Sequence, residues 1–134
     1  MTIEKKDIIK LKKLISTGNR IHLGFLIEYG FFNWVESIHD VIREKKPLSF
    51  RFTYEDWYSK ALVVLETFQP DFLDEFIQLY RNENQAVSVS PPYTIFDFLV
   101  GNEIRRSHDY SIKVAAVKQN LERQLEILET ILKC

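Results

Sequence analysis

Apolar side chains recur with the period of an α-helix along most of this chain, most regularly in residues 110–133. Six positions in this segment alternate spacings of four and three residues: Val114, Lys118, Leu121, Leu125, Leu128 and Leu132. Four more apolar residues widen the stripe: Ala115, Val117, Ile127 and Ile131. A stripe of this width favours packing inside a bundle over a two-stranded coiled coil. We therefore expect a long C-terminal helix from about Tyr110 to Lys133, about 36 Å in length.

A second helical pattern lies at residues 3–15, where an aliphatic stripe is opposed by a basic face. The lysines of this face are Lys5, Lys6, Lys10, Lys12 and Lys13. We expect Thr2 to cap this helix and Gly18 to end it in the left-handed conformation that glycine adopts readily. Three of the four glycines fall within residues 18–30, for which we expect a flexible connection or a short helix.

The middle of the chain predicts further helices. Apolar residues from Phe31 to Ile42 follow helical spacing, so we expect an amphipathic helix that ends near Pro47. Thr53–Asp56 has the form of a capping box and is expected to open the next helix. Pro70 fits the first turn of the helix after that, because its missing N–H has no partner there in any case.

A polar loop and a short helix complete the series. Residues 82–93 contain Pro91-Pro92 and are predicted to form the loop. Thr94–Val100 is predicted to form a short helix with Asp97 as its capping partner. No segment shows a convincing strand period. The chain is therefore expected to be all-α: a single helical domain over residues 1–134, built as a bundle of five or six helices with a long C-terminal helix.

Composition agrees with this fold and excludes several classes of protein. A chain of 134 residues with 46% hydrophobic residues is long enough to bury its own core. Its single cysteine, Cys134, excludes an intramolecular disulfide and a cysteine-based zinc site. The 18 basic and 19 acidic residues give a net charge of −1, which is unlike a nucleic-acid binder. With no spanning segment and no signal peptide visible, we expect a cytoplasmic protein with no membrane partner.

The cluster with the clearest chemical potential is Glu103-Ile-Arg-Arg-Ser-His-Asp109. An Arg and a His close together in a small helical protein resemble the HEPN ribonucleases, whose motif places four to six residues between the two. Here two residues separate Arg105 from His108, and one separates Arg106 from His108. Arg105 and His108 are three apart and can share a helical face. A HEPN-like ribonuclease, or a degenerate relative, is thus the alternative to a charged helix start.

Other polar residues give weaker signals. His22 and His39 have no partner at metal-ligand spacing, so we expect no metal and no cofactor. The acidic residues Asp71, Asp74 and Glu75 suit the start of a helix, where the dipole favours carboxylates. The Lys5–Lys13 face is a third-ranked candidate for nucleic acid, and a solvated helix face is the preferred interpretation. Aromatic side chains at helical phase are expected to serve the core first.

A longer resemblance involves the order of several segments. Residues 61–80 carry a helix, a Pro-Asp step and Asp-Glu-Phe-Ile-Gln-Leu-Tyr-Arg, which a polar loop connects to residues 93–101 and then to a long helix containing Gln124-Leu-Glu-Ile-Leu-Glu129. This order, together with Phe32-Asn-Trp34 upstream, resembles a family of small helical bacterial domains of uncharacterised function, some in phage-defence settings. The resemblance covers roughly residues 25–132. It implies the helical fold and brings no catalytic residues.

These observations together predict a non-catalytic interaction module. We expect an accessory protein of a bacterial defence or nucleic-acid-processing system that binds another protein, with a homodimer as an open alternative. Nucleic acid is the less favoured partner. No catalytic, cofactor-binding or metal-binding residue is assigned, and Arg105, Arg106 and His108 are the only catalytic candidates.

We predict that the protein does not cleave RNA. HEPN chemistry needs an Arg and a His held together at one site, and the spacing of Arg105 and His108 does not reproduce the motif. The near-zero net charge also removes electrostatic steering toward RNA. The wild type and an Arg105→Ala/His108→Ala variant are compared on structured and single-stranded RNA, and both should be inactive. Cleavage by the wild type that a folded variant loses would establish the ribonuclease instead.

Overall fold

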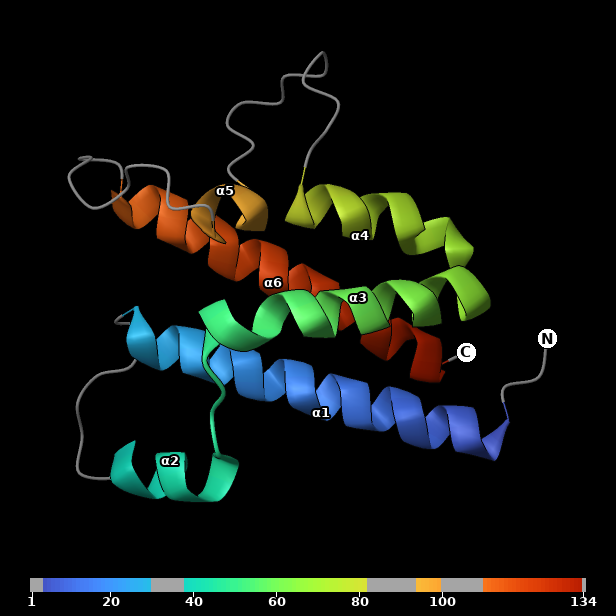
Figure 1. The fold of residues 1–134 in the computed structure, drawn as a ribbon, viewed down its shortest axis with the longest axis horizontal. Coiled ribbons are helices and arrows are strands. Elements are labelled where there is room, and N and C mark those ends of the chain that lie inside the picture. The colour runs from blue at the N-terminus through green and yellow to red at the C-terminus, as the bar shows by residue number, and fades with distance from the viewer. Residues whose placement is uncertain (1–3, 30–37, 82–93, 100–109, 134) are drawn as a thin grey trace, which may run out of the picture.

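The computed structural model describes residues 4–29, 38–81, 94–99 and 110–133, and every regular element in these ranges is a helix (Figure 1). The elements are α1 (Lys5–Glu28), α2 (Ile38–Lys45), α3 (Phe50–Phe68), the 3-10 turn η1 (Pro70–Phe72), α4 (Leu73–Tyr80), α5 (Ile95–Leu99) and α6 (Tyr110–Lys133). The all-α fold and the long C-terminal helix predicted from the sequence are therefore confirmed.

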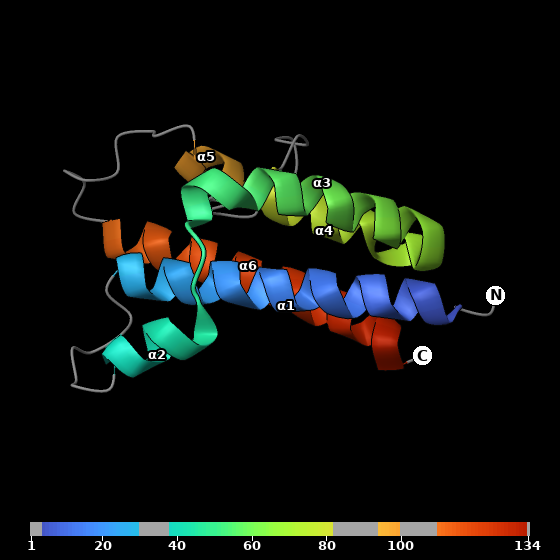
Figure 2. The same cartoon turned by 60° about the horizontal axis from the view of Figure 1, so that its bottom comes forward.

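Four of these helices make up the bundle, which is fewer than the five or six expected. α1 packs against α3 and α6, and α4 packs against α6 and α3. Figure 2 shows α3 and α4 lying together over the two long helices α1 and α6. The short α5 packs on α6 and α4, whereas α2 lies outside the bundle beside α1 (Figures 1 and 2).

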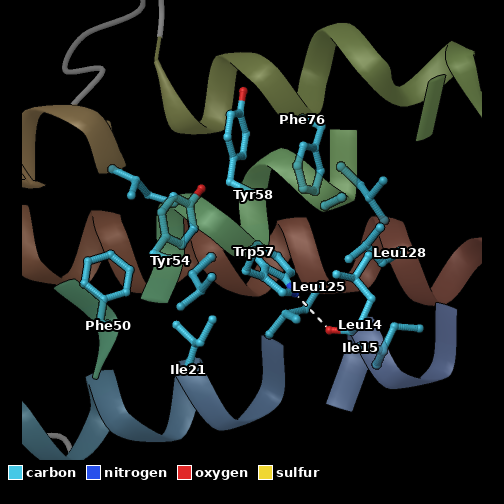
Figure 3. Close-up of a cluster of buried hydrophobic side chains, with 14 of the residues drawn as sticks. Leu14, Ile15, Ile21, Phe50, Tyr54, Trp57, Tyr58, Phe76, Leu125 and Leu128 are labelled. Atoms are coloured by element: carbon cyan, nitrogen blue, oxygen red, sulfur yellow. Dashed lines mark hydrogen bonds between the residues drawn. The ribbon is translucent and has the colours of Figure 1, made fainter. Parts of the chain in front are cut away.

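Apolar side chains from all four bundle helices and from α5 meet in one core, part of which is shown in Figure 3. The aromatic residues Trp57, Tyr58, Phe76 and Phe98 are buried there, as expected. On α6 the buried apolar residues are Val114, Val117, Leu121, Leu125, Ile127, Leu128 and Ile131. Leu132, which the heptad pattern placed in the core, is instead 36% exposed. The core face of α6 is therefore turned slightly from the predicted seam.

One polar side chain, Gln124, is fully buried in this core. Its Oε1 accepts a hydrogen bond from the Tyr54 hydroxyl at 2.7 Å, and its Nε2 donates to the Phe76 carbonyl at 3.1 Å. Burial raises the pKa of Tyr54 well above its ordinary value, which keeps its hydroxyl protonated as a donor. A single residue of α6 thus satisfies polar groups on both α3 and α4.

The boundaries of α1 differ from the expectation at both ends. The helix starts at Lys5 with Glu4 in the N-cap position, and Thr2, the predicted cap, lies outside the described residues. It continues through Gly18 as far as Glu28, so the predicted end at Gly18 is wrong, and residues 18–28 belong to this long helix instead of a flexible connection or a separate short helix.

Packing explains the two glycines inside α1. A Cβ added to Gly18 would lie 2.5 Å from Leu125 Cδ2 and 2.8 Å from Trp57 Cζ2. A Cβ added to Gly24 would overlap with the carbonyl oxygen of Leu48, in the segment that leads into α3. Gly18 therefore allows α3 and α6 to approach α1 closely, Gly24 allows the same for the segment before α3, and neither glycine ends the helix.

The start of α3 also differs from the prediction. The helix begins at Phe50, and the hydroxyl of Ser49 accepts a hydrogen bond from the Phe52 N–H at 3.4 Å. The capping box predicted at Thr53–Asp56 is therefore wrong. Thr53 lies inside the helix, where its hydroxyl donates to the Ser49 carbonyl.

Other predicted boundaries agree with the structure. α2 ends at Lys45, close to the predicted stop before Pro47, and Pro70 opens the turn that leads into α4. A short helix follows Thr94, as α5. The predicted loop at residues 82–93 lies outside the described residues.

An exposed ion pair connects α4 to α6. Arg123 donates to the two carboxylate oxygens of Glu75 at 2.6 and 3.0 Å and also to Glu126, one turn along α6. The hydrogen bonds from Arg123 lower the pKa of Glu75 from its ordinary 4.5, although burial acts in the opposite direction. Glu75 therefore pairs across helices in addition to occupying the first turn of α4.

We predict that Gly24→Ala lowers the free energy of unfolding by about 1–3 kcal/mol, although alanine is the better helix former by about 1 kcal/mol. The new Cβ would meet the Leu48 carbonyl, and that segment is held by a 3.0 Å hydrogen bond from the Leu48 N–H to the Arg20 carbonyl. Ser16→Ala, at an exposed site in the same helix, is the control and should change stability by less than about 0.5 kcal/mol. Urea denaturation followed by circular dichroism measures both, and equal stability of the two variants would contradict this account of Gly24.

We also predict that the Glu75 carboxyl titrates below 4.5 in the wild type and closer to 4.5 in Arg123→Met. A carboxylate whose pKa is lowered by folding stabilises the protein above its unfolded-state pKa, and this contribution is lost as the pH falls through the folded-state pKa. The stability difference between wild type and Arg123→Met should therefore shrink on acidification. NMR titration of the Glu75 side chain measures the pKa, and identical values in the two proteins would refute the proposed role of Arg123.

Candidate functional site

The three catalytic candidates from the sequence, Arg105, Arg106 and His108, lie outside the described residues, so the ribonuclease alternative stays a prediction. The side chain of His39 lies outside them as well. All five lysines of the basic face of α1 are exposed, as expected for a solvated face. The structure therefore brings none of these groups into a described catalytic arrangement, and the candidate site has to be built from other residues.

His22 does acquire a partner, but not one typical of a metal site. Its Nε2 lies 2.9 Å from Glu122 Oε2, which Lys118 also approaches at 2.8 Å. Burial raises the pKa of Glu122, but the hydrogen bonds from Lys118 and His22 outweigh this effect and lower it. The cluster contains one carboxylate and joins α1 to α6. It serves as a structural contact, and sequence spacing did not indicate it because 100 positions separate His22 from Glu122.

The feature best suited to hold another molecule is a groove between α1 and α3. It encloses about 630 Å³. Its lining residues come from both helices and from the segment before α3: Lys10, Lys13, Leu14, Thr17, Leu48, Phe52, Thr53, Asp56, Trp57, Lys60 and Val64. We call it the α1–α3 groove. Along α3 its lining runs from Phe52 to Val64, which corresponds to about 18 Å or slightly more than three helical turns.

The floor of the α1–α3 groove is apolar and belongs to the core. Leu14 and Trp57 both line the groove and are both buried. The Trp57 indole Nε1 donates to the Leu14 carbonyl at 2.8 Å, as the dashed line in Figure 3 shows. Because this bond and the surrounding core hold the indole in place, the floor is formed before any ligand arrives.

The rim of the α1–α3 groove is mainly basic. Lys10 and Lys13 lie on the α1 side, and Lys60 lies on the α3 side. Asp56 is the one acidic residue of the lining, and it pairs with Lys60 at 3.1 Å. Within the described part of the chain, neither Lys10 nor Lys13 has an ion pair or a side-chain hydrogen bond. Three lysines and one aspartate give the rim a charge of +2, although the whole chain carries −1.

Two large apolar side chains of α3 are exposed, and one of them, Phe52, lines the groove. Phe52, at the groove's end, is 90% exposed, and Val63 is 63% exposed. They are eleven residues apart, so they lie on almost the same face of α3, three turns from each other. An exposed aromatic residue beside an apolar groove is typical of a surface that another molecule covers.

A second cleft, between α1 and α2, has a different character. Its lining carries Lys12, Arg20, Lys45 and Lys46 against Glu44. Arg20 is already engaged, because its Nε donates to the Lys46 carbonyl at 2.7 Å. This bond holds the end of α2, where Lys46 has a φ of 49°. The cleft lacks an exposed aromatic residue comparable to Phe52, so the α1–α3 groove is the better candidate.

Metal and membrane features are not found in the described ranges. There, no group of three or more His, Cys, Asp and Glu side chains is placed to hold a metal ion. None of the helices in those ranges is both long and apolar enough to cross a membrane.

The chain was compared with protein-family models, with curated proteins and with solved structures, and no match was found. The resemblance of residues 25–132 to small helical bacterial domains therefore stays a prediction.

Proposed function

We propose that this protein is a non-catalytic helical module that binds another protein through the α1–α3 groove. Its role is that of an accessory chain whose activity consists of recognition. The observation that carries the proposal is Phe52, a phenylalanine that is 90% exposed at the end of an apolar groove.

The energetics of exposure support this function. Covering a large apolar side chain contributes about 1.5–3 kcal/mol. Phe52 makes no such contribution to the folded chain itself, because it is almost fully exposed. Aromatic anchors beside a pocket are also the residues that dominate binding energy in protein interfaces. Burial of Phe52 by a partner would therefore add to the free energy of binding, next to a groove floor that is already rigid.

The rim supports a protein ligand over a small-molecule substrate. An enzyme pocket normally gathers a few convergent polar groups. The described lining of the groove contains one carboxylate, which already pairs with Lys60 at 3.1 Å, and neither histidine nor cysteine. An apolar floor with lysines around it is better suited to recognition than to chemistry.

Site-specific photocrosslinking tests the proposal. The photoreactive amino acid p-benzoylphenylalanine replaces Phe52 in the full chain, and the cells that naturally produce the protein are irradiated. Because position 52 is exposed, the replacement should leave the fold intact. We expect one discrete crosslinked protein, identified by mass spectrometry.

The same photoreactive residue at Gln119, an exposed position on α6 away from the groove, is the matched control. It should give no crosslink to that protein. If position 52 gives no discrete crosslink, or if both positions give the same products, the groove is not a protein-binding site.

A further inference from the structure

The α1–α3 groove has a length, a floor and a charge that together specify what kind of protein segment fits it. We propose that its occupant is an acidic amphipathic helix of about three turns, with its apolar face on the groove floor and carboxylates beside the lysines of the rim. This inference rests on the proposed function, because it names the partner of the same groove.

The walls of the groove favour a helical occupant. Both long walls are helices, and the N–H and C=O groups in the interior of a helix are already paired along the helix. In the segment before α3, the Leu48 N–H is already bonded to the Arg20 carbonyl. An extended segment would therefore find no free backbone groups in the walls, and its own would lose hydration without replacement. A helix satisfies its own backbone and offers only side chains. The groove length of about 18 Å accommodates three turns of such a helix.

The floor specifies the apolar face of the occupant. Leu14 and Trp57 lie at its middle, and Val64 and Phe52 lie toward its two ends. A helix that follows this line presents apolar side chains at spacings of three and four residues, the usual anchors of a helix bound in a groove. Phe52 then packs against the last anchor of the occupant and loses its exposure to water.

The rim specifies the charge. Lys10 and Lys13 have no ion pair within the described part of the chain, and Lys60 alone is neutralised locally, by Asp56 at 3.1 Å. A basic occupant would be repelled by two unpaired ammonium groups one turn apart on the same face of α1. Carboxylates on the flanks of an apolar stripe complement them and fix the register of the occupant.

Other occupants fit less well. A bilayer surface is flat and cannot reach a floor that lies between two helices. A nucleic acid would need a more extended basic surface than three lysines, one of which is paired. A second copy of this chain would have to supply an acidic amphipathic helix with a free apolar face. α6, which carries several glutamates, already uses its apolar face in the core.

The test uses two designed peptides of about 15 residues, each a helix with leucines at i, i+4, i+7 and i+11. One carries glutamates on both flanks of the leucine stripe, and the other carries lysines at the same positions. Fluorescence anisotropy measures the binding of each labelled peptide to the full chain at low salt. We expect the glutamate peptide to bind at least about tenfold more tightly, with an affinity that falls as salt screens the charges.

Charge reversal on the protein makes the test specific to the groove. Lys10→Glu/Lys13→Glu should weaken the glutamate peptide by at least about tenfold and strengthen the lysine peptide. Lys5→Glu/Lys12→Glu is the matched control: it makes the same change of charge on α1, at positions that do not line the groove, and should keep the preference for glutamate. Phe52→Ser should weaken the glutamate peptide. Circular dichroism verifies that each variant is folded.

Several outcomes would overturn the inference. Equal binding of the two peptides, or equal effects of the two charge reversals, would show that charge does not select the occupant. A crosslink from position 52 would still support the proposed function in that case. Binding of neither peptide would exclude an acidic amphipathic helix. A dimer in sedimentation that Phe52→Ser dissociates, or Phe52-dependent binding to phosphatidylserine vesicles, would assign the groove to a second copy or to a membrane.

Discussion

The contact of Trp57 of α3 and Leu125 of α6 with α1 at Gly18 sets the positions of three helices at once. A Cβ at Gly18 would lie 2.8 Å from the indole and 2.5 Å from the leucine, so only glycine fits. The Trp57 indole N–H donates a hydrogen bond to the Leu14 carbonyl, one turn earlier on α1, and this bond holds the indole in its place against Gly18. Glycine is usually a weak point in a helix, but here it permits the contact that defines the interior. Gln124 extends the same constraint to α4, since it joins the Tyr54 hydroxyl to the Phe76 carbonyl.

The binding surface follows from this contact. Trp57 is buried against Gly18 on one side and lines the α1–α3 groove on another, so the residue that fixes the helices also forms the floor of the groove. A floor held in this way loses little side-chain entropy on binding, because its entropy was already lost on folding. The flexible parts of the site are the lysine side chains of the rim and the exposed ring of Phe52. They supply charge selection and apolar contact at the edges of a rigid centre.

Sequence periodicity predicted the parts of the structure that depend on local pattern. The limits of α6, the end of α2 and the turn at Pro70 all agree with it, because each depends on residues close in sequence. The pattern predicted a helix end at Gly18, which is wrong, because side chains of α3 and α6 that pack against this position require a glycine there. It was also wrong at the start of α3, because Ser49 and Thr53 are both good capping residues and local sequence did not separate them. Because of this error, the sequence did not indicate the site. With a helix start at Thr53, Phe52 is a residue outside the helix, whereas with a start at Phe50 it lies on the helix face opposite the core.

The pairing of Gln124 with Tyr54 and Phe76 was not predictable from the sequence, since helical phase does not reveal which polar residue finds buried partners.

The floor and the rim of the groove consist of different residues, so the specificity of binding can change without a change of fold. Leu14 and Trp57 are core residues, so a substitution there alters stability and binding together. Lys10, Lys13 and Phe52 are exposed and contribute little to folding, so they can change with much less effect on stability. A chain built in this way can keep one fold while the rim adapts to a different helix, because specificity depends on charges and on one aromatic ring that the core does not need. The same separation explains why an almost fully exposed phenylalanine is compatible with a stable bundle: the cost of its exposure in the free protein is small, and covering it contributes to binding.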